Sequence, residues 1–262
     1  VDGLQNDDNL SSSDEDISES DCSMTDCDTD DEIDPDTTPI ALTPVSKPNK
    51  GKLKVLQASS LPLVTLMNVR SLYNKPENFK KFLNEHGIEV RIISESWERE
   101  DMSLEKLPNT KKYKIHSYKR PKVKAKKQPG GGCAIVYNEQ RFNVNKLDVF
   151  VPKGVEACWV VLKPVNKNDR IENIAVASIY VSPSSVYKTA TINHIIETVH
   201  LLRSQYDNRI NYLIGGDLNR LKIDSVLESY GPLRQIITSA TRDSVILENI
   251  ITDLHTLYQT PQ

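Results

Sequence analysis

The chain has 262 residues, and its formal net charge of −3 conceals two segments of opposite charge. The first 46 residues hold fifteen Asp and Glu and no Lys or Arg, whereas the remaining 216 hold 21 acidic and all 33 basic residues. A segment of 216 residues can bury a sizeable core as one domain, which excludes a small scaffold held together by disulfides. No apolar run reaches the roughly 20 residues that cross a bilayer, so we expect no membrane partner.

The acidic N-terminal segment is predicted to be disordered. Ser, Thr, Asp and Glu dominate residues 7–36, and the few apolar side chains bury too little surface to offset the entropy that ordering would cost. Prolines and lysines between residues 39 and 54 mark the change to the basic segment. We divide the chain into a disordered acidic tail and linker, residues 1–58, and one domain, residues 59–262.

Six apolar runs rich in β-branched residues predict buried strands. They cover residues 61–67, 90–93, 133–137, 157–162, 174–179 and 212–214. Helical patterns lie between some of these strands but not between all of them. This mixture favours an α/β sandwich with largely antiparallel pairing over a doubly wound parallel sheet.

Two amphipathic helices are predicted. The first lies between the first two strands, where Asn74 is the N-cap, Pro76 fits the first turn and Gly87 ends the helix. The second spans about residues 189–205, and His194 lies off its apolar stripe. The stripe consists of Ile192, Ile195, Ile196, Val199 and Leu202.

Polar side chains follow four of the predicted strands. Asn68, Glu95, Tyr180 and the pair Asp217 and Asn219 each lie just beyond the last apolar residue of a strand. If these strand ends share one edge of the sandwich, the five side chains converge. Carboxylate, amide and phenol oxygens without a neighbouring Cys or His suit a hard cation such as Mg²⁺. Such an ion polarises a phosphoryl oxygen while a second carboxylate activates water, so phosphoryl chemistry is predicted here.

Six segments carry a resemblance to a known superfamily. In order, they read LMNVRSLYNK, IISESW, GGGCAIVY, IAVASIYVSPSS, YLIGGDLNRL and TRDSVILENIITD. Together they resemble the endonuclease/exonuclease/phosphatase (DNase-I-like) superfamily, and most closely the apurinic-type endonuclease domain of non-LTR retrotransposons. The resemblance covers about residues 60–258 and implies a four-layer α/β sandwich.

The resemblance also implies a role for each polar residue at the strand ends. Glu95 matches the metal-binding glutamate, and Asn68 matches an asparagine that lies beside the metal and the phosphate. Tyr180 matches a tyrosine that contacts the phosphate. Asp217 matches the aspartate that activates the attacking water, and Asn219 matches a residue that orients the substrate.

Two positions depart from the pattern of the superfamily. Glu248 stands where the superfamily has an aspartate that supports a catalytic histidine, and we keep Glu248 among the candidate catalytic residues. Either the neighbouring residues accommodate the extra methylene of Glu248, or the methylene displaces the supporting carboxylate by about an ångström. Such a displacement would lower the rate on the order of a hundredfold. The closing Ser-Asp-His block, which supplies that histidine, is not found before Gln262. We therefore expect a domain that is incomplete at its C-terminus and weakly active or inactive.

A basic stretch lies in the middle of the chain. Nine of the seventeen residues from Lys111 to Lys127 are Lys or Arg, with two tyrosines among them. Such a stretch neutralises phosphates and offers aromatic faces to bases, so it predicts binding to DNA, or to RNA; a solvated basic loop is the alternative. The candidate nucleic-acid-binding residues are Lys111, Lys112, Lys114, Lys119, Arg120, Lys122, Lys124, Lys126, Lys127 and Arg70.

The same stretch bears on location. Residues 119–127 have the composition of a nuclear localisation patch. Cys22 and Cys27 lie in the acidic tail, and Cys133 and Cys158 have no partner at metal-ligand spacing, which favours a reducing, intracellular setting. We expect an intracellular, nuclear monomer.

Three functions are compatible with these features. The first is a Mg²⁺-dependent DNA endonuclease derived from a retrotransposon, in which water attacks phosphorus. The second is a degenerate copy that binds nucleic acid without turnover, which Glu248 and the missing histidine block favour. The third is a phosphatase or exonuclease of the same superfamily that acts on a smaller substrate.

Overall fold

The computed structural model describes residues 39–44, 61–72, 78–79, 81, 83, 87–98, 112–120, 130–147, 149–166, 171–239, 241 and 246–258. Residues 1–38 of the predicted acidic tail and most of the linker lie outside these ranges. So does most of the first predicted helix, of which residues 78–79, 81 and 83 are described and are helical.

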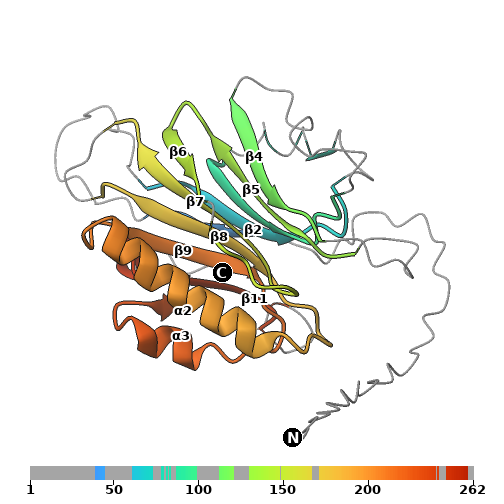
Figure 1. The fold of residues 1–262 in the computed structure, drawn as a ribbon. Coiled ribbons are helices and arrows are strands. Elements are labelled where there is room, and N and C mark those ends of the chain that lie inside the picture. Colours follow the sequence, from blue (N-terminus) through green and yellow to red (C-terminus); the bar gives the residue numbers. More distant parts are fainter. Residues whose placement is uncertain are drawn as a thin grey trace, which may run out of the picture. The chain divides into compact units, whose positions relative to one another are not determined.

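Two mixed β-sheets form the centre of the fold (Figure 1). One sheet has the order β1-β2-β3-β5-β4, and the other has the order β10-β11-β9-β8-β7-β6. Among the described strands, β2 pairs parallel with β3 and β8 pairs parallel with β9, whereas the other neighbours are antiparallel. The pairing confirms the predicted sandwich. The strands are β1 Ile40–Leu42, β2 Val64–Asn68, β3 Val90–Ser94, β4 Tyr113–Tyr118, β5 Cys133–Asn138, β6 Phe142–Lys146, β7 Glu156–Pro164, β8 Ile174–Tyr180, β9 Asn211–Asp217, β10 Arg234–Gln235 and β11 Glu248–Thr252.

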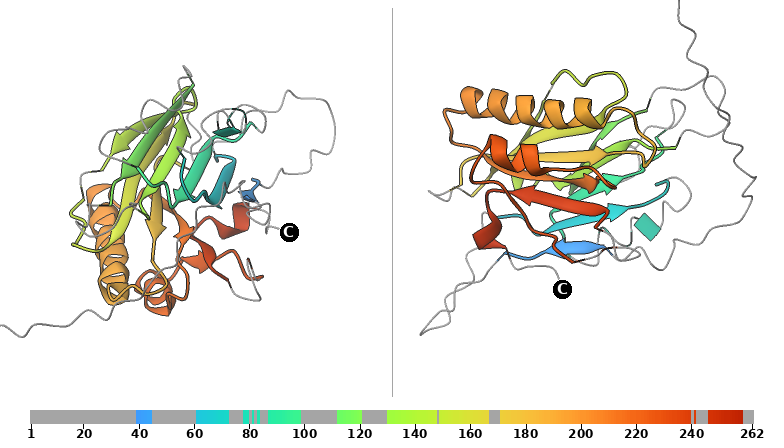
Figure 2. Two further views of the ribbon diagram at one scale, coloured as in Figure 1. Left: turned by 90° about the vertical axis from the view of Figure 1, so that its right-hand side faces the viewer. Right: turned by 90° about the horizontal axis from the view of Figure 1, so that it is seen from below.

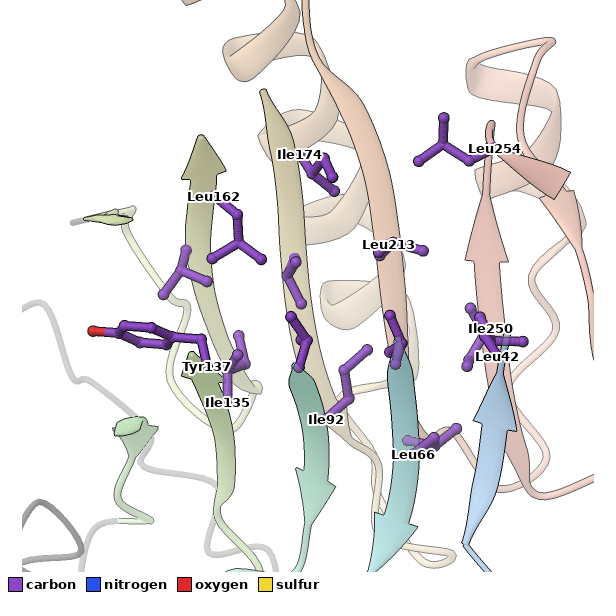
Figure 3. Close-up of a cluster of buried hydrophobic side chains, with 14 of the residues drawn as sticks. Leu42, Leu66, Ile92, Ile135, Tyr137, Leu162, Ile174, Leu213, Ile250 and Leu254 are labelled. Carbon is purple, nitrogen blue, oxygen red and sulfur yellow. The ribbon is translucent and has the colours of Figure 1, made fainter. Parts of the chain in front are cut away.

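Aliphatic side chains fill the space between the two sheets (Figure 3). Leu66 on β2 and Ile92 on β3 lie on one side of this core, and Leu213 on β9 and Ile250 on β11 lie on the other. The central strands are covered on both faces, so every residue of β3, β5 and β8 is buried. This double coverage explains why their sequences read as continuous apolar runs rather than as an alternation.

Helices cover the outer faces of both sheets. Helices α2 (Lys188–Gln205) and α3 (Asp224–Ser229) lie beside each other on the outer face of the six-stranded sheet (Figure 2). On the outer face of the five-stranded sheet, the helical residues Phe79 and Leu83 pack against Ile93 of β3. These four layers confirm the predicted fold class. The last described element is the 3₁₀ helix η2 (His255–Leu257), and no described helix has the length and apolar character needed to span a membrane.

The division of the chain at residue 58 needs a correction. Residues 40–42 form β1, which pairs with β2 so that Ile40 lies opposite Leu66. The side chain of Leu42 is fully buried in the core between the sheets. The prediction of disorder for residues 1–58 is therefore wrong for β1, because three residues between prolines are too short a run to be recognised as a strand.

The predicted position of His194 on α2 is also wrong. His194 is 2% exposed, and its Nε2 accepts a hydrogen bond of 3.1 Å from the indole N–H of Trp159 on β7. The helix begins at Lys188, one residue before the predicted start. It buries two threonines together with Ile195, Val199 and Leu202 of the predicted stripe. A hydrogen-bonded imidazole can be buried at little cost. The prediction used only the polarity of histidine and therefore assigned His194 to the wrong face of the helix.

Candidate active site

The carboxyl ends of the two parallel strand pairs meet at one edge of the sandwich. Asn68 lies level with Ser94 at the ends of β2 and β3, and Tyr180 lies level with Asp217 at the ends of β8 and β9. Two hydrogen bonds join the sheets at this edge. The Ser178 hydroxyl donates to the carbonyl of Ile93 at 2.8 Å, and the backbone N–H of Asp217 donates to the Ser94 hydroxyl at 2.8 Å. The predicted convergence of strand ends is therefore present.

Asn68 connects the two carboxylates of the site. Its side-chain N–H groups donate to Glu95 Oε1 and to Asp217 Oδ2, each at 2.8 Å. Its amide oxygen accepts the backbone N–H of Arg70 at 3.2 Å. In this arrangement Asn68 orients both carboxylates, while its role as a metal ligand stays a prediction.

The second carboxylate oxygen of Glu95 and that of Asp217 also accept hydrogen bonds. The indole N–H of Trp97 donates to Glu95 Oε2 at 3.3 Å. The backbone N–H of Asn219 donates to Asp217 Oδ1 at 3.1 Å, and the Asn219 side chain donates to the carbonyl of Val181 at 2.6 Å. The predicted site residues Asn68, Glu95, Asp217 and Asn219, at or just after the ends of β2, β3 and β9, are thus fixed by their neighbours. Such pre-organisation is typical of a functional site.

Backbone strain is concentrated at this edge. Seven non-glycine residues among those described have a positive φ, and five of them lie in the loops that follow β2, β3 and β9. L-residues enter this region at an energetic cost, and such residues cluster at functional sites. The five are Arg70 (43°), Ser71 (98°), Glu95 (54°), Trp97 (51°) and Asn219 (46°). Hydrogen bonds between the loops hold this geometry, since the N–H of Ser71 donates to the carbonyl of Glu95 at 2.9 Å.

Asp217 is placed to exchange a proton near neutral pH. Its side chain is 3% exposed, and burial raises its pKa to about 6. The hydrogen bond from Asn68 opposes this rise, whereas the charges of Glu248 and Glu95 add to it. Glu248 begins β11 directly opposite Asp217, which places the predicted candidate beside the site. A carboxylate whose pKa lies just below neutral pH is suited to accept a proton from water.

Tyr180 ends β8 beside Glu156, the first residue of β7. Burial raises the pKa of the Tyr180 phenol, and the charges of Glu95 and Asp217 raise it further. The phenol is therefore protonated at neutral pH and can donate a hydrogen bond to an anion. The guanidinium of Arg120 lies 5.6 Å from the centre of the Tyr180 ring.

The donor atoms of this edge fit a hard cation. Among the residues that the structure describes, no three or more Asp, Glu, His or Cys are gathered to hold a metal ion. Mg²⁺ needs fewer, because it keeps several waters and is bound through one or two carboxylates. Glu95 and Asp217 supply two carboxylates linked through Asn68, and the set contains oxygen donors without sulfur or imidazole. The residues present therefore fit Mg²⁺.

The described part of the basic stretch is the edge strand β4 and the residues beside it. The Lys114 ammonium lies 3.8 Å from Glu139, and the Lys119 ammonium lies 3.3 Å from the buried Glu98. Lys112 lies 5.0 Å from the centre of the Tyr113 ring. The other predicted nucleic-acid contacts of the stretch, Lys111, Lys122, Lys124, Lys126 and Lys127, lie outside the described residues.

The structure adds residues to the site that the sequence did not reveal. Ser94 carries the hydroxyl that holds Asp217, and Glu156 is a buried carboxylate that binds Arg120. The signal for Glu156 was a lone acidic residue at the start of a long apolar run. The carbonyls of Gly131 and Gly132 accept the N–H groups of Trp97 and Ser96 at 2.9 and 3.3 Å.

Comparison with known proteins identifies the fold. No protein-family model matches the chain, and no curated protein matches it. The solved structure of the AP endonuclease LMAP from Leishmania major matches with 13% identity over 72% of this chain and 78% of that chain, with a TM-score of 0.50. The chain has the fold of this AP endonuclease.

Two other solved structures match the chain as well. An endonuclease/exonuclease/phosphatase from Bacteroides vulgatus has 12% identity over 69% of this chain and 79% of that chain, with a TM-score of 0.49. The 3'-5' exonuclease NExo from Neisseria meningitidis has 11% identity over 72% and 86%, with a TM-score of 0.48. The similarity to LMAP, at 13% identity, establishes the fold alone, and this is the sandwich that the six segments predicted.

Proposed function

We propose that this chain is a Mg²⁺-dependent phosphodiesterase that cleaves DNA by attack of water on phosphorus. The observation that carries the proposal is the Asn68 amide, which donates to Glu95 and Asp217 at 2.8 Å at an edge where both sheets present the carboxyl ends of parallel strands. Asp217 accepts the proton of the attacking water. Tyr180 donates its phenol proton in a hydrogen bond to the phosphate, and Asn219 orients the substrate.

Glu95 would hold the metal ion in this proposal. A bound Mg²⁺ supplies polarisation of a phosphoryl oxygen and offsets charge on the leaving group. Asn68 keeps Glu95 and Asp217 at a fixed separation, and Trp97 limits rotation of the Glu95 carboxylate. We also propose an origin from a non-LTR retrotransposon endonuclease, which the order of the six segments supports. The basic stretch supports a nuclear location.

A second candidate is a copy that binds nucleic acid without turnover. Glu248 supports this candidate, because it places a second carboxylate directly opposite Asp217 and adds negative charge at the site. The four histidines that the structure describes also lie elsewhere, on β4, α2 and η2, rather than at the ends of β2, β3, β8 and β9. They are His116, His194, His200 and His255.

Nicking of supercoiled plasmid in Mg²⁺ and in EDTA tests the proposal. We expect weak nicking by the wild type in Mg²⁺, none in EDTA, and a loss of at least about a hundredfold in Asp217→Ala, because a general base contributes on the order of 10²–10⁴ in rate. Glu172→Gln is the matched control, since this exposed carboxylate precedes β8 at the opposite edge of the sheet.

Three outcomes separate the candidates. Equal nicking by the wild type and Asp217→Ala contradicts the proposal. DNA binding without nicking in either supports the non-catalytic copy. Hydrolysis of p-nitrophenyl phosphate without nicking supports a phosphatase, and release of mononucleotides from a labelled duplex end supports an exonuclease.

A further inference from the structure

Arg120 is held differently from the other cations of the basic stretch. Its Nε donates to Glu156 Oε1 at 2.8 Å, and its Nη2 also binds that oxygen. The side chain of Glu156 is 8% exposed, whereas the acidic partner of Lys114 is 39% exposed. Lys119 also has a buried partner, Glu98, but reaches it with a single ammonium at 3.3 Å. A buried guanidinium–carboxylate pair is rigid and costly to break, unlike an exposed ion pair. Arg120 therefore has one defined orientation.

Glu156 binds the glycine turn as well as Arg120. Its Oε2 accepts the backbone N–H of Gly132 at 2.5 Å. The carbonyls of Gly131 and Gly132 in turn accept the N–H groups of Trp97 and Ser96. One buried carboxylate thus fixes both Arg120 and the turn that supports the loop of Glu95.

The guanidinium of Arg120 packs between this turn and Tyr180. A Cβ on Gly131 would lie 2.4 Å from Arg120 Cζ, so the guanidinium occupies the space that the glycine leaves open. The same guanidinium also lies over the Tyr180 ring. Burial alone would lower the pKa of Arg120, but the hydrogen bond and charge of Glu156 outweigh burial and raise it. Its side chain stays 30% exposed, and Nη1 makes no hydrogen bond to a described residue.

We propose that Arg120 binds the substrate phosphate at this site and that Glu156 is its positioning residue. The inference deepens the proposed function and rests on it for the identity of the substrate. The edge is rich in negative charge from Glu95, Asp217 and Glu248, so an anion needs a cation there. A guanidinium that keeps free N–H groups binds phosphate oxygens with directed, charge-assisted hydrogen bonds.

Binding of inorganic phosphate tests the role of Arg120 without any need for turnover. Trp97 reports on the site because its indole N–H bonds to Glu95, and the other of the two tryptophans, Trp159, is fully buried. We would titrate phosphate in Mg²⁺ and follow tryptophan fluorescence. Arg120→Gln is expected to raise the Kd about tenfold or more, the loss expected for a hydrogen bond to a charged group.

Two further variants control for charge and for folding. Lys163→Gln removes an exposed cation near the far end of β7 and is expected to keep the wild-type Kd. Arg120→Lys keeps the charge but cannot bind Glu156 through two nitrogens and still present others, so its Kd is expected to rise severalfold. Wild-type affinity in Arg120→Gln, or no phosphate binding by the wild type, overturns the proposal.

A double-mutant cycle tests the positioning role of Glu156. If Glu156 aims Arg120, the effect of Arg120→Gln on the Kd shrinks to about twofold or less in a Glu156→Gln background. An undiminished effect in that background overturns the positioning role. Plasmid nicking is measured in parallel: Arg120-dependent phosphate binding without nicking refutes the proposed function and leaves the phosphate site standing.

Discussion

Asp217→Asn is expected to stabilise the protein at neutral pH while it removes the proposed base. Burial raises the pKa of Asp217 from its ordinary value of 3.8 to about 6 in the folded protein. The folded state therefore binds this proton more tightly than the unfolded chain does. Ionisation of Asp217 costs stability progressively as the pH rises from about 4 to about 6, and the cost stays constant above that.

The size of the effect follows from two opposing contributions. The upward shift of about two pKa units corresponds to about 3 kcal/mol of stability at pH 7.5, which an uncharged side chain would recover. Asp217 accepts hydrogen bonds from Asn68 and from the N–H of Asn219. An amide keeps one acceptor oxygen and loses the other, at a cost of about 1 kcal/mol. The net gain is about 2 kcal/mol, or about 4–8 °C in Tm for a domain of this size.

Thermal and urea unfolding in EDTA would measure this gain. We expect it at pH 7.5 and expect it to shrink steadily towards pH 4, where the folded protein carries Asp217 protonated. Glu172→Gln, an exposed carboxylate in an ion pair of 3.5 Å with Arg209, should change the stability by less than about 0.5 kcal/mol. A variant less stable than the wild type at pH 7.5, or a gain that does not depend on pH, would refute the reasoning.

Three other perturbations have defined outcomes. Gly216→Ala should lower Tm by about 6–12 °C, the shift for about 3 kcal/mol, because its Cβ would lie 1.7 Å from the carbonyl oxygen of Ile179. The control variant for this change, Gly231→Ala, has open space around its new Cβ, and its Tm should lie within about 2 °C of the wild-type Tm. Burial lowers the pKa of His194, so the free energy of unfolding should fall as the pH drops below about 6.5, and urea titrations of His194→Gln should show a flatter dependence. Ser178→Ala removes one of the hydrogen bonds between the sheets and should cost about 1–3 kcal/mol by urea unfolding, with unchanged stability arguing against that link.

The strands that position the site were predictable because they are buried on both faces. β3, β8 and β9 are buried almost throughout, and a polar or phenolic residue at or just after the end of each strand lies at the site. The same reasoning fails for β6, where Phe142 is buried but the following residues are partly or fully exposed. It also fails for β4, because Lys114 alternates with the buried Tyr113 and Ile115 and reads as part of a basic loop.

The contacts that organise the site were not predictable, because each depends on strand register. Asp217 meets Asn68 from a position 149 residues away, and the Ser94 hydroxyl meets the N–H of Asp217 from 123 residues away. Glu156 lies beside Tyr180 only through the antiparallel pairing of β7 with β8. A pattern of residue types states which side chains are available, whereas register decides which of them touch.

Several features of this edge lower the stability of the fold, which is itself an argument that the edge has a function. Asp217 and Glu156 are buried carboxylates, and apolar side chains of similar size at these positions would stabilise the sandwich more than the charges do. Non-glycine residues with positive φ add strain in the same loops, at Arg70, Glu95 and Asn219. Core packing requires none of these features. A fold that gathers charge, strain and oriented hydrogen bonds at one edge has the properties of a site that binds a charged ligand, and a phosphate held beside a divalent cation matches all three.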